Sequence, residues 1–220
     1  MAENAAENGV EFCCGREVTG IRLEEDGIYT VTAGNGVFRS RWIVNCAGLG
    51  SDKIASMLGI EGYTLHPCRG EYFVLDKKLK DTLPLPVYPV PNYKTGGLGI
   101  HLTPTLEGNI LVGPSTEYIR NRGDYATTRR IMELLIRDGS RIYPYLKREN
   151  LIRSFAGIRP KLSSKEEGGY HDFVIERRAD IAHHAVILVG IESPGLTSAV
   201  PSAREIVRLI EEAEELAGQG

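Results

Sequence analysis

Alternating hydrophobic and polar positions in the first fifty residues predict a run of short β-strands. A polar opening segment, 1–8, has the character of the end of a helix, which Gly9 can close in a left-handed conformation. The strands expected after it cover 10–14, 17–23, 28–33 and 37–48. Asp26-Gly27 and the segment 34–36 supply the turns between the later strands. The pattern therefore predicts a small β-meander that leads into a buried strand over 42–45.

After residue 48 the pattern changes to that of a helix. Ser51 is the expected N-cap, and Gly59 is expected to end the helix. From 63 to 115 the chain returns to strand-like patterns that proline and glycine interrupt. Strands are expected there at 70–76, 85–90, 97–103 and 109–113.

Two amphipathic helices and three more strands are expected in the rest of the chain. Asp124 is the expected cap of the first helix, whose apolar face carries Ile131, Leu134, Leu135 and Ile142. The second helix has apolar residues at helical spacing at Ala199, Ala203, Ile206, Val207 and Ile210. The further strands are expected at 151–158, 172–176 and 185–189. This mixture predicts an α/β fold of the mixed α+β kind.

The order of the elements predicts two interleaved domains. Residues 63–150 are expected to form a β-rich domain with one helix. Residues 1–62 and 151–220 are expected to form the two parts of a framework in which strands lead into helices. Because the framework resumes after the β-rich segment, we expect a domain arrangement that is discontinuous in sequence.

The composition is that of an ordinary globular protein, and it excludes several classes of function. The 220-residue chain is 42% hydrophobic and 25% charged, and its formal net charge of −3 does not favour a nucleic-acid partner. No apolar run approaches the roughly 20 residues of a membrane-spanning helix. The polar first residues lack the basic and apolar regions of a signal peptide. We therefore expect a cytoplasmic protein without a transmembrane segment.

The cysteine pattern does not favour a metal or redox site. The four cysteines are Cys13, Cys14, Cys46 and Cys68, and they form no Cys-x-x-Cys pair. None of them has a histidine at zinc-ligand spacing. We expect no metal ligands, and buried reduced thiols in place of a redox pair.

Two strand-to-helix turns rich in small residues have the character of ligand-binding turns. The first runs from Asn45 to Asp52 and the second from Gly190 to Ala199. Small residues let a ligand approach the backbone, and the N-terminus of a helix favours phosphate. A tight strand–helix connection without a ligand is the alternative, and the first turn taken alone favours it. Two such turns in one chain suit the edges of a large ligand with several polar groups.

Arg159 lies at the expected end of an apolar strand, where Pro160 prevents regular continuation of the sheet. An arginine at such a place can project into a cleft, where its planar guanidinium matches a carboxylate or a phosphate. The alternative is an ordinary surface ion pair.

The order of several short motifs resembles that of the FAD-dependent oxidoreductases grouped around D-amino-acid oxidase, glycerol-3-phosphate dehydrogenase and L-2-hydroxyglutarate dehydrogenase. The motifs are Glu17-Val18, Ile43–Gly48, Arg69-Gly70-Glu71-Tyr72, Gly99–Pro104, Gly113-Pro114, Gly157–Pro160, Asp172–Ile175 and Ser193–Thr197. The resemblance covers nearly the whole chain. The motifs over 69–72 and 99–104 favour the hydroxyglutarate and glycerol-phosphate branches.

The resemblance implies FAD as the cofactor and a partial Rossmann-like FAD-binding framework interrupted by a β-rich substrate domain. The implied cofactor-binding residues are Val18 at the adenine, Ala47 and Gly48 near the adenosine and pyrophosphate, and Gly195, Leu196 and Thr197 at the flavin. At the flavin, free N–H groups of a helix N-terminus would stabilise the negative charge that hydride transfer leaves on the ring.

On the substrate side, the resemblance implies that Arg159 grips the carboxylate or phosphate of a small anionic substrate. His101 would take the hydroxyl proton, because imidazole exchanges protons near neutral pH. A structural or exposed histidine is the alternative. Arg69 and Tyr72 would line the same cleft, although core packing is the stronger expectation for Tyr72.

The chain departs from the family in one large respect. It lacks the Gly-x-Gly-x-x-Gly motif that holds the FAD pyrophosphate in this family. We therefore expect the C-terminal portion of an enzyme that oxidises a 2-hydroxy acid or glycerol 3-phosphate, with CH–NH₂ donors less favoured. A missing segment or a partner chain would supply the pyrophosphate site. The alternative is a non-catalytic, substrate-side domain that completes a site with a separate FAD-binding chain, and the electron acceptor stays open.

Overall fold

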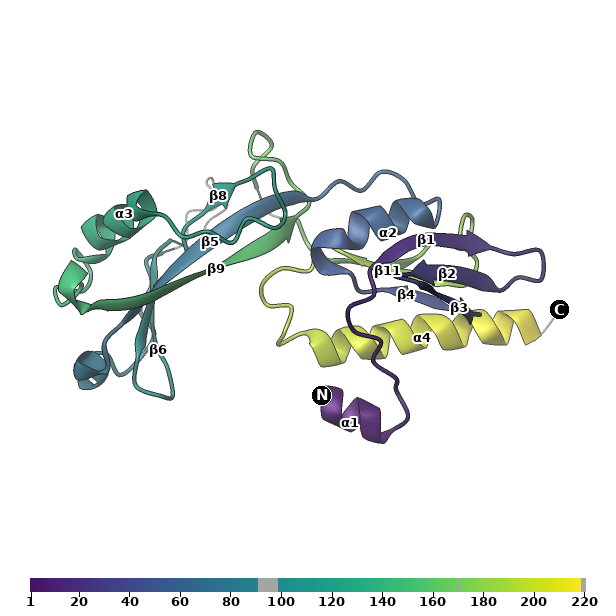
Figure 1. The fold of residues 1–220 in the computed structure, drawn as a ribbon, viewed down its shortest axis with the longest axis horizontal. Coiled ribbons are helices and arrows are strands. Elements are labelled where there is room, and N and C mark those ends of the chain that lie inside the picture. Colours follow the sequence, from purple (N-terminus) through teal and green to yellow (C-terminus); the bar gives the residue numbers. More distant parts are fainter. Residues whose placement is uncertain (91–98, 170, 219–220) are drawn as a thin grey trace. The chain divides into compact units, whose positions relative to one another are not determined.

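The structure, a computed structural model, describes residues 1–90, 99–169 and 171–218 of the 220-residue chain. The chain divides into two compact units, and both are discontinuous in sequence (Figure 1). The first unit comprises Met1–Tyr63, Ile175–Leu188 and Val200–Gly220, and the second comprises Thr64–Val174 and Val189–Ala199. Each unit contains its own β-sheet structure.

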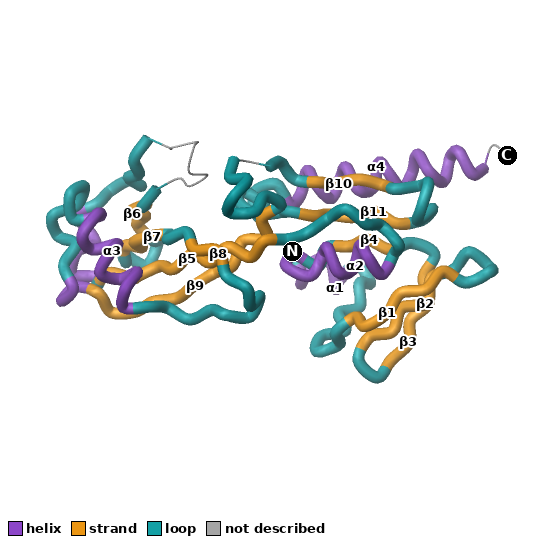
Figure 2. Tube along the Cα trace, turned by 90° about the horizontal axis from the view of Figure 1, so that it is seen from above, coloured by secondary structure: helices purple, strands orange, loops and turns teal. Residues whose placement is uncertain are grey.

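In the described part of the chain, the strands of the first unit form two small sheets. One is an antiparallel meander of β1 (Val18–Leu23), β2 (Tyr29–Ala33) and β3 (Gly36–Ser40), which Figure 2 shows as a separate layer from the other sheet. The other has the order β10-β11-β4, from β10 (Val174–Arg177), β11 (Ala185–Val189) and β4 (Ile43–Asn45). Strand β11 runs parallel to β4, and all its residues are buried, as expected of an apolar strand between two neighbours.

The helices of this unit are α1 (Ala2–Glu7), α2 (Ser51–Met57) and α4 (Ala199–Gly218), and a short 3₁₀ turn, η1 (Gly48–Gly50), joins β4 to α2. Asn45 fixes this turn from within. Its Nδ2 donates a hydrogen bond to the carbonyl oxygen of Ser51 at 2.8 Å, and its Oδ1 accepts one from the amide of Ala47 at 3.2 Å. A buried amide that is satisfied in this way specifies the conformation of the turn.

The second unit is built on an antiparallel sheet in which β5 (His66–Leu75) is the central strand (Figure 1). One edge of β5 pairs along its whole length with β9 (Leu151–Lys161). The other edge pairs with β7 (Ile110–Gly113) near one end and with β8 (Glu117–Tyr118) near the other, and β6 (His101–Pro104) lies outside β7. Helix α3 (Arg129–Gly139) and the 3₁₀ turns η2 (Lys77–Thr82) and η3 (Arg148–Asn150) complete the unit.

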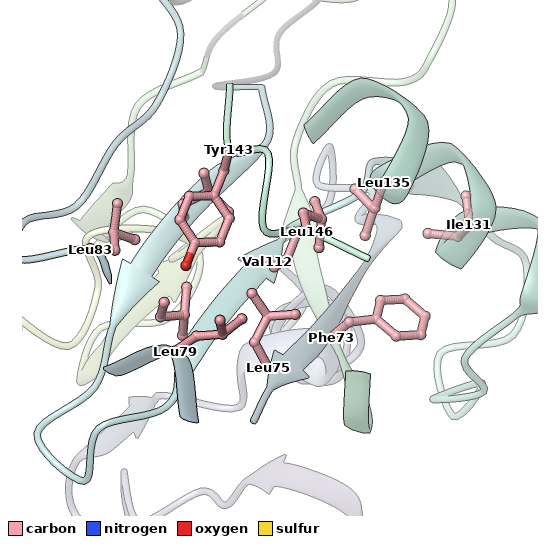
Figure 3. Packing of buried hydrophobic residues seen from close by; sticks show 11 residues of the cluster. Phe73, Leu75, Leu79, Leu83, Val112, Ile131, Leu135, Tyr143 and Leu146 are labelled. Atoms are coloured by element: carbon pink, nitrogen blue, oxygen red, sulfur yellow. The ribbon is translucent and has the colours of Figure 1, made fainter. Parts of the chain in front are cut away.

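A hydrophobic core covers one face of this sheet. Figure 3 shows side chains of α3 and of the segment after it directed toward the strands. The core consists of Phe73, Leu75, Leu79, Leu83, Leu102, Ile110, Val112, Ile131, Leu135, Tyr143 and Leu146. Each fully buried leucine or isoleucine stabilises the fold by roughly 1.5–3 kcal/mol relative to an exposed one. Burial of this core therefore contributes much of the stability of the unit.

Most of the predicted strands are present, but three predictions are wrong. Residues 10–14 form no strand, and Val10 and Phe12 are exposed. Residues 85–90 form none either, because Pro86 and Pro89 lack the N–H that a ladder needs, and only Val87 makes an isolated bridge, to Leu102. The run 37–48 divides into β3 and β4, which belong to different sheets.

Other strands begin or end a few residues from the predicted positions. Strand β5 starts before residue 70, β9 continues beyond 158, and β10 starts after 172. Strand β6 begins at His101, whereas the first two residues of the predicted strand 97–103 lie outside the described residues.

The helix caps were also predicted at the wrong residues. Helix α2 has Gly50 as its N-cap, and Ser51 makes no capping hydrogen bond. Helix α3 begins after Thr128, whose hydroxyl accepts a hydrogen bond from the amide of Ile131, and not at Asp124. Ile142 lies beyond the end of α3. In α4, Ala203 and Val207 are exposed, so the buried side of that helix is narrower than the spacing suggested.

The boundary between the units differs from the expected one at residue 150. Because β9 pairs with β5 along its whole length, residues 151–174 belong to the β-rich unit. Residues 189–199 also belong to that unit. The four cysteines are free thiols, but only Cys68 is buried, so the expectation of buried thiols is wrong for the other three.

Candidate functional site

The second face of the five-stranded sheet carries several of the predicted site residues. Alternate residues of a strand point to opposite faces. Since Phe73, Leu102 and Val112 point into the core, their neighbours Tyr72 and His101 point to the other face. The register between β5 and β9 places Phe155 opposite Tyr72 and Arg159 opposite Cys68, on that same face. We call it the open face, defined by Tyr72, His101, Phe155 and Arg159.

Two aromatic rings form an apolar platform on the open face. The rings of Tyr72 and Phe155 stack with their centroids 5.2 Å apart and their planes 5° apart. Phe155 keeps 45% of its surface exposed, which is a large exposure for a phenylalanine in the middle of a long strand. Burial raises the pKa of Tyr72, while the positive charge of Arg159 opposes that rise.

Arg159 reaches across the sheet from β9. Its Nη2 donates a hydrogen bond to the carbonyl oxygen of Ser115, at 2.7 Å, in the segment that joins β7 to β8. Among the residues that the structure describes, Arg159 makes no ion pair with a carboxylate. One of its five N–H donors is thus occupied by a neutral partner, and its charge is available to an anion.

The structure places Arg69 on the opposite face, which corrects the prediction that it lines the substrate cleft. Only 5% of its surface is exposed. Its guanidinium lies 2.7 Å from Glu117, 2.8 Å from Asp124 and 3.7 Å from Glu71. The hydrogen bond and charge of Glu117 raise the pKa of Arg69 against the effect of burial. A guanidinium with these partners belongs to the structure of the sheet and has no charge to offer a substrate.

His101 shares the open face but lies several strands away from Arg159. His101 pairs with Gly113 and is therefore level with Tyr72 and Phe155, whereas Arg159 lies four residues further along β9. Three strand spacings of roughly 4.8 Å across the sheet, and four residues of roughly 3.3 Å along it, separate the two backbones by about 20 Å. The Arg159 side chain crosses β5 toward β7 and β8, and this shortens the gap between the functional groups. The His101 ring also contacts that of Tyr88, at 5.3 Å between centroids.

The predicted flavin-side residues Gly195, Leu196 and Thr197 belong to the same unit. A buried ion pair ties their loop to β9, since Lys161 Nζ lies 3.2 Å from Glu192 Oε1 and the two side chains are only 7% and 12% exposed. The amide of Gly195 donates a hydrogen bond to the carbonyl oxygen of Glu192 at 2.6 Å. Leu196 is 85% exposed and Thr197 is exposed, so a ligand can approach this part of the loop.

Val18, Ala47 and Gly48 lie in the first unit. Val18 starts β1 opposite Ala33, just before a local irregularity in the pairing, and α2 packs against β1. Gly48 has a positive φ of 54°, and a Cβ there would meet nothing within 4 Å. Ala47 and Gly48 are both exposed, so the turn is open to solvent.

The sequence did not indicate four features of the second unit. These are the stacked ring of Phe155, the carbonyl of Ser115 that accepts from Arg159, the Lys161–Glu192 ion pair, and the position of Gly70 next to the Arg159 guanidinium. The first had a detectable signal, since Phe155, Gly157 and Arg159 alternate along one strand. Within the described residues, no group of three or more His, Cys, Asp or Glu side chains is placed to hold a metal ion. No described helix is long and apolar enough to cross a membrane.

Comparisons with known proteins agree with this arrangement. The family model of FAD dependent oxidoreductases matches residues 1–209. Glycerol 3-phosphate dehydrogenase from Caloramator mitchellensis is 33% identical over 199 residues, covering 90% of this chain and 39% of the relative. The mitochondrial L-2-hydroxyglutarate dehydrogenase of Arabidopsis thaliana is 35% identical over 178 residues, covering 74% and 36%.

Solved structures give the same result. L-alpha-glycerophosphate oxidase from Mycoplasma pneumoniae, determined with FAD bound, superposes with a TM-score of 0.81 at 32% identity, covering 96% of this chain and 54% of that one. Glycine oxidase from Bacillus cereus, at 20% identity and a TM-score of 0.79, shows the shared fold. The chain spans about half the length, or less, of the relatives it matches. Since the family model covers 209 of its 220 residues, the chain belongs to the FAD-dependent oxidoreductase family, as its motifs predicted.

Proposed function

We propose that the protein containing this chain oxidises the hydroxyl group of a small anionic substrate, a 2-hydroxy acid or glycerol 3-phosphate, by hydride transfer to FAD. The observation that carries the proposal is the cation of Arg159 on the open face, which has no carboxylate partner among the described residues and lies on the same face as the stacked rings of Tyr72 and Phe155. A half-buried guanidinium without a carboxylate partner is suited to a substrate anion. The matching relatives include enzymes named for glycerol 3-phosphate and for L-2-hydroxyglutarate.

In this proposal, each residue of the open face has one task. Arg159 binds the carboxylate or phosphate and so fixes one end of the substrate. The platform of Tyr72 and Phe155 excludes water from the carbon skeleton. His101 removes the proton of the hydroxyl group as a hydride leaves the carbon that bears this hydroxyl. Such general-base catalysis contributes roughly 10²–10⁴-fold in rate.

The residues present fit part of an FAD site. FAD supplies the acceptor for the hydride. In the second unit, the loop of Gly195, Leu196 and Thr197 would face the flavin. In the first unit, Val18, Ala47 and the open turn at Gly48 would face the adenosine half. The pyrophosphate motif Gly-x-Gly-x-x-Gly is absent from this chain, so these residues supply only a part of the cofactor contacts.

Anaerobic reduction of the flavin tests the proposed reaction in the whole, FAD-loaded protein that contains this chain. We expect glycerol 3-phosphate or L-2-hydroxyglutarate to bleach the flavin absorbance. Glycerol, which lacks the anion, and glycine, which offers an amine, are the controls and should act far more slowly. Reduction by glycine alone would overturn the assignment to CH–OH donors, and equal reduction by glycerol would remove the need for an anion clamp.

A second candidate follows from the short span of the chain relative to its relatives. It is a substrate-side domain that completes a site with a separate FAD-binding chain. Equilibrium dialysis of these 220 residues with FAD tests whether they hold the cofactor by themselves, and in both cases we expect weak or no binding. A one-to-one complex at sub-micromolar FAD would show that the chain holds the cofactor without further contacts.

A further inference from the structure

Three segments of the second unit meet at the guanidinium of Arg159. The side chain starts on β9, passes over Gly70 of β5, and ends at the carbonyl oxygen of Ser115. Gly70 provides the space for this path. A Cβ at residue 70 would lie 3.1 Å from Arg159 Nη2, 3.1 Å from the Cβ of Pro114 and 3.3 Å from the carbonyl oxygen of Ser115. Such distances are shorter than ordinary van der Waals contact, so any side chain there would push the guanidinium away from Ser115.

Ser115 is itself held firmly from the strand below. It is 7% exposed. Its amide donates to the carbonyl oxygen of Glu71 at 3.1 Å, and its hydroxyl accepts from the amide of Glu71 at 3.0 Å. Two hydrogen bonds to one residue hold Ser115, whose carbonyl oxygen accepts the hydrogen bond of Arg159, in place on β5.

The carboxylate of Glu71 connects these contacts to the face of the sheet that the hydrophobic core covers. Glu71 is fully buried, and its carboxylate accepts hydrogen bonds from the amide of Thr128 at 2.6 Å and from its hydroxyl at 3.1 Å. Thr128 is the N-cap of α3. The carbonyl that receives Arg159 is therefore connected through one residue to the rigid, core-packed side of the sheet.

We propose that Gly70 and Ser115 are positioning residues that hold the Arg159 guanidinium in one orientation for the substrate anion. The inference rests on the proposed function, since it presumes that Arg159 binds the anion. An arginine free to rotate loses side-chain entropy on binding, whereas one already fixed by a neutral acceptor keeps its charge and its remaining N–H groups in place. Gly70 keeps the path open, and Ser115 defines its end.

Gly157 offers a matched control. It lies directly opposite Gly70 in the register of β5 and β9, on the same face. A Cβ at residue 157 would meet nothing within 4 Å. Gly70→Ala and Gly157→Ala thus make the same chemical change at paired positions of one sheet, and only the first touches Arg159.

A double-mutant cycle in the whole, FAD-loaded protein tests the inference, with KM and kcat measured for glycerol 3-phosphate and for L-2-hydroxyglutarate. We expect Gly70→Ala to raise KM about tenfold with a smaller change in kcat, and Gly157→Ala to change KM less than about twofold. In an Arg159→Ala background the effect of Gly70→Ala should disappear, because the residue then has nothing to position. Ser115→Ala should also raise KM in the unmodified background and have no effect in the Arg159→Ala background. If a lowered melting temperature shows that Gly70→Ala is misfolded, Ser115→Ala tests the inference in its place.

The outcomes separate the inference from the function on which it rests. If Arg159→Ala leaves KM unchanged for both substrates, the anion clamp itself is wrong. If Arg159→Ala raises KM but Gly70→Ala behaves like Gly157→Ala, only the positioning role is wrong. A penalty of Gly70→Ala that persists in the Arg159→Ala background would assign Gly70 to the stability of the sheet and would also overturn the inference.

Discussion

The two faces of the sheet in the second unit each carry an arginine, and the two arginines have opposite surroundings. Arg69 is buried on the α3 face among the carboxylates of Glu71, Glu117 and Asp124. Arg159 lies half-buried on the open face, with a neutral carbonyl as its hydrogen-bond partner. The same side chain is thus a structural element where carboxylates neutralise its charge, and we propose that it is a binding element where they do not.

The comparison also shows how one strand supplies both settings. Residues Arg69 and Gly70 are adjacent in β5, so they point to opposite faces. The motif Arg-Gly-Glu-Tyr therefore places its arginine and glutamate in the buried network and its glycine and tyrosine at the candidate site. The sequence prediction placed Arg69 and Tyr72 in the same cleft, whereas the alternation of the strand puts them on opposite faces.

The largest effect should come from the open face, at His101. In the whole protein we expect His101→Asn to slow flavin reduction by roughly 10²–10⁴-fold, because asparagine keeps hydrogen bonding but cannot take a proton. Substrate affinity should change much less. Stopped-flow reduction measures both, and His183→Asn, at an exposed histidine of the first unit, is the control. An unchanged reduction rate would assign His101 to structure.

The next largest effect should come from Arg159. Removing one partner of a desolvated charge pair costs on the order of 2–5 kcal/mol, so Arg159→Ala should weaken substrate binding by roughly 30-fold to a few thousand-fold. Arg159→Lys should recover part of the loss, since lysine keeps the charge without the planar fork. Substrate titration with FAD content as the control measures this. Binding within about threefold of the unmodified protein would contradict the assignment.

A matched substitution on the buried face sharpens the contrast. Arg69→Met leaves the buried carboxylate of Glu71 without its cation, and breaking a buried pair costs roughly 3–5 kcal/mol. We expect the lower end of that range, because Glu117 and Asp124 are partly exposed. Arg159→Met should lower the unfolding free energy by less than about 1 kcal/mol. Chemical denaturation of both variants measures the difference, and equal losses would remove the distinction between the two faces.

The smallest effect concerns an interaction outside this sheet and provides a baseline. Burial, followed by the hydrogen bond to Glu176, raises the pKa of Tyr63 to about 12. The unfolded value is about 10, so the contribution to stability is fully present below pH 10 and is lost as the pH rises toward 12.

Between pH 10 and 12, the free energy of unfolding should fall less for Tyr63→Phe than for the unmodified protein. The difference should be under about 1 kcal/mol, because the Tyr63 side chain is partly exposed. Thermal unfolding across this range measures the effect. Tyr125→Phe, at an exposed tyrosine, is the control. Parallel pH profiles for Tyr63→Phe and the unmodified protein would show that this phenol does not set the alkaline limit.

The sequence predicted the elements whose signal is local. The meander, β7, β11 and the two long helices follow from alternation, turn residues and helical spacing. The predicted cap of α3 was wrong because aspartate and threonine are both good N-caps, and the hydrogen bonds that Thr128 donates to the distant Glu71 cannot be read from the local sequence. The predicted domain boundary at residue 150 was wrong because the pairing of β9 with β5 joins residues that are far apart in the chain.

The candidate site was predictable to the same extent. The motifs supplied the family and the identity of Arg159 and His101 as candidates. They did not indicate which face each residue occupies, because that depends on the register between strands. The register shows that Arg69 and Arg159 lie on opposite faces of the sheet. It also places Phe155 and Gly70 on the face of Arg159, whose guanidinium binds the carbonyl of Ser115.

The long pairing of β5 with β9 has a consequence for how the protein is made. Leu75 at the end of β5 and Leu151 at the start of β9 are paired although 76 positions apart in sequence. At synthesis rates of roughly 5–20 residues per second, β5 leaves the ribosome on the order of 4–15 seconds before its partner. During that interval one edge of a ten-residue strand has no native neighbour and is open to wrong pairing with other chains. Slower translation of the intervening segment lengthens the exposure, so the yield of folded protein depends on what shields that edge in the cell.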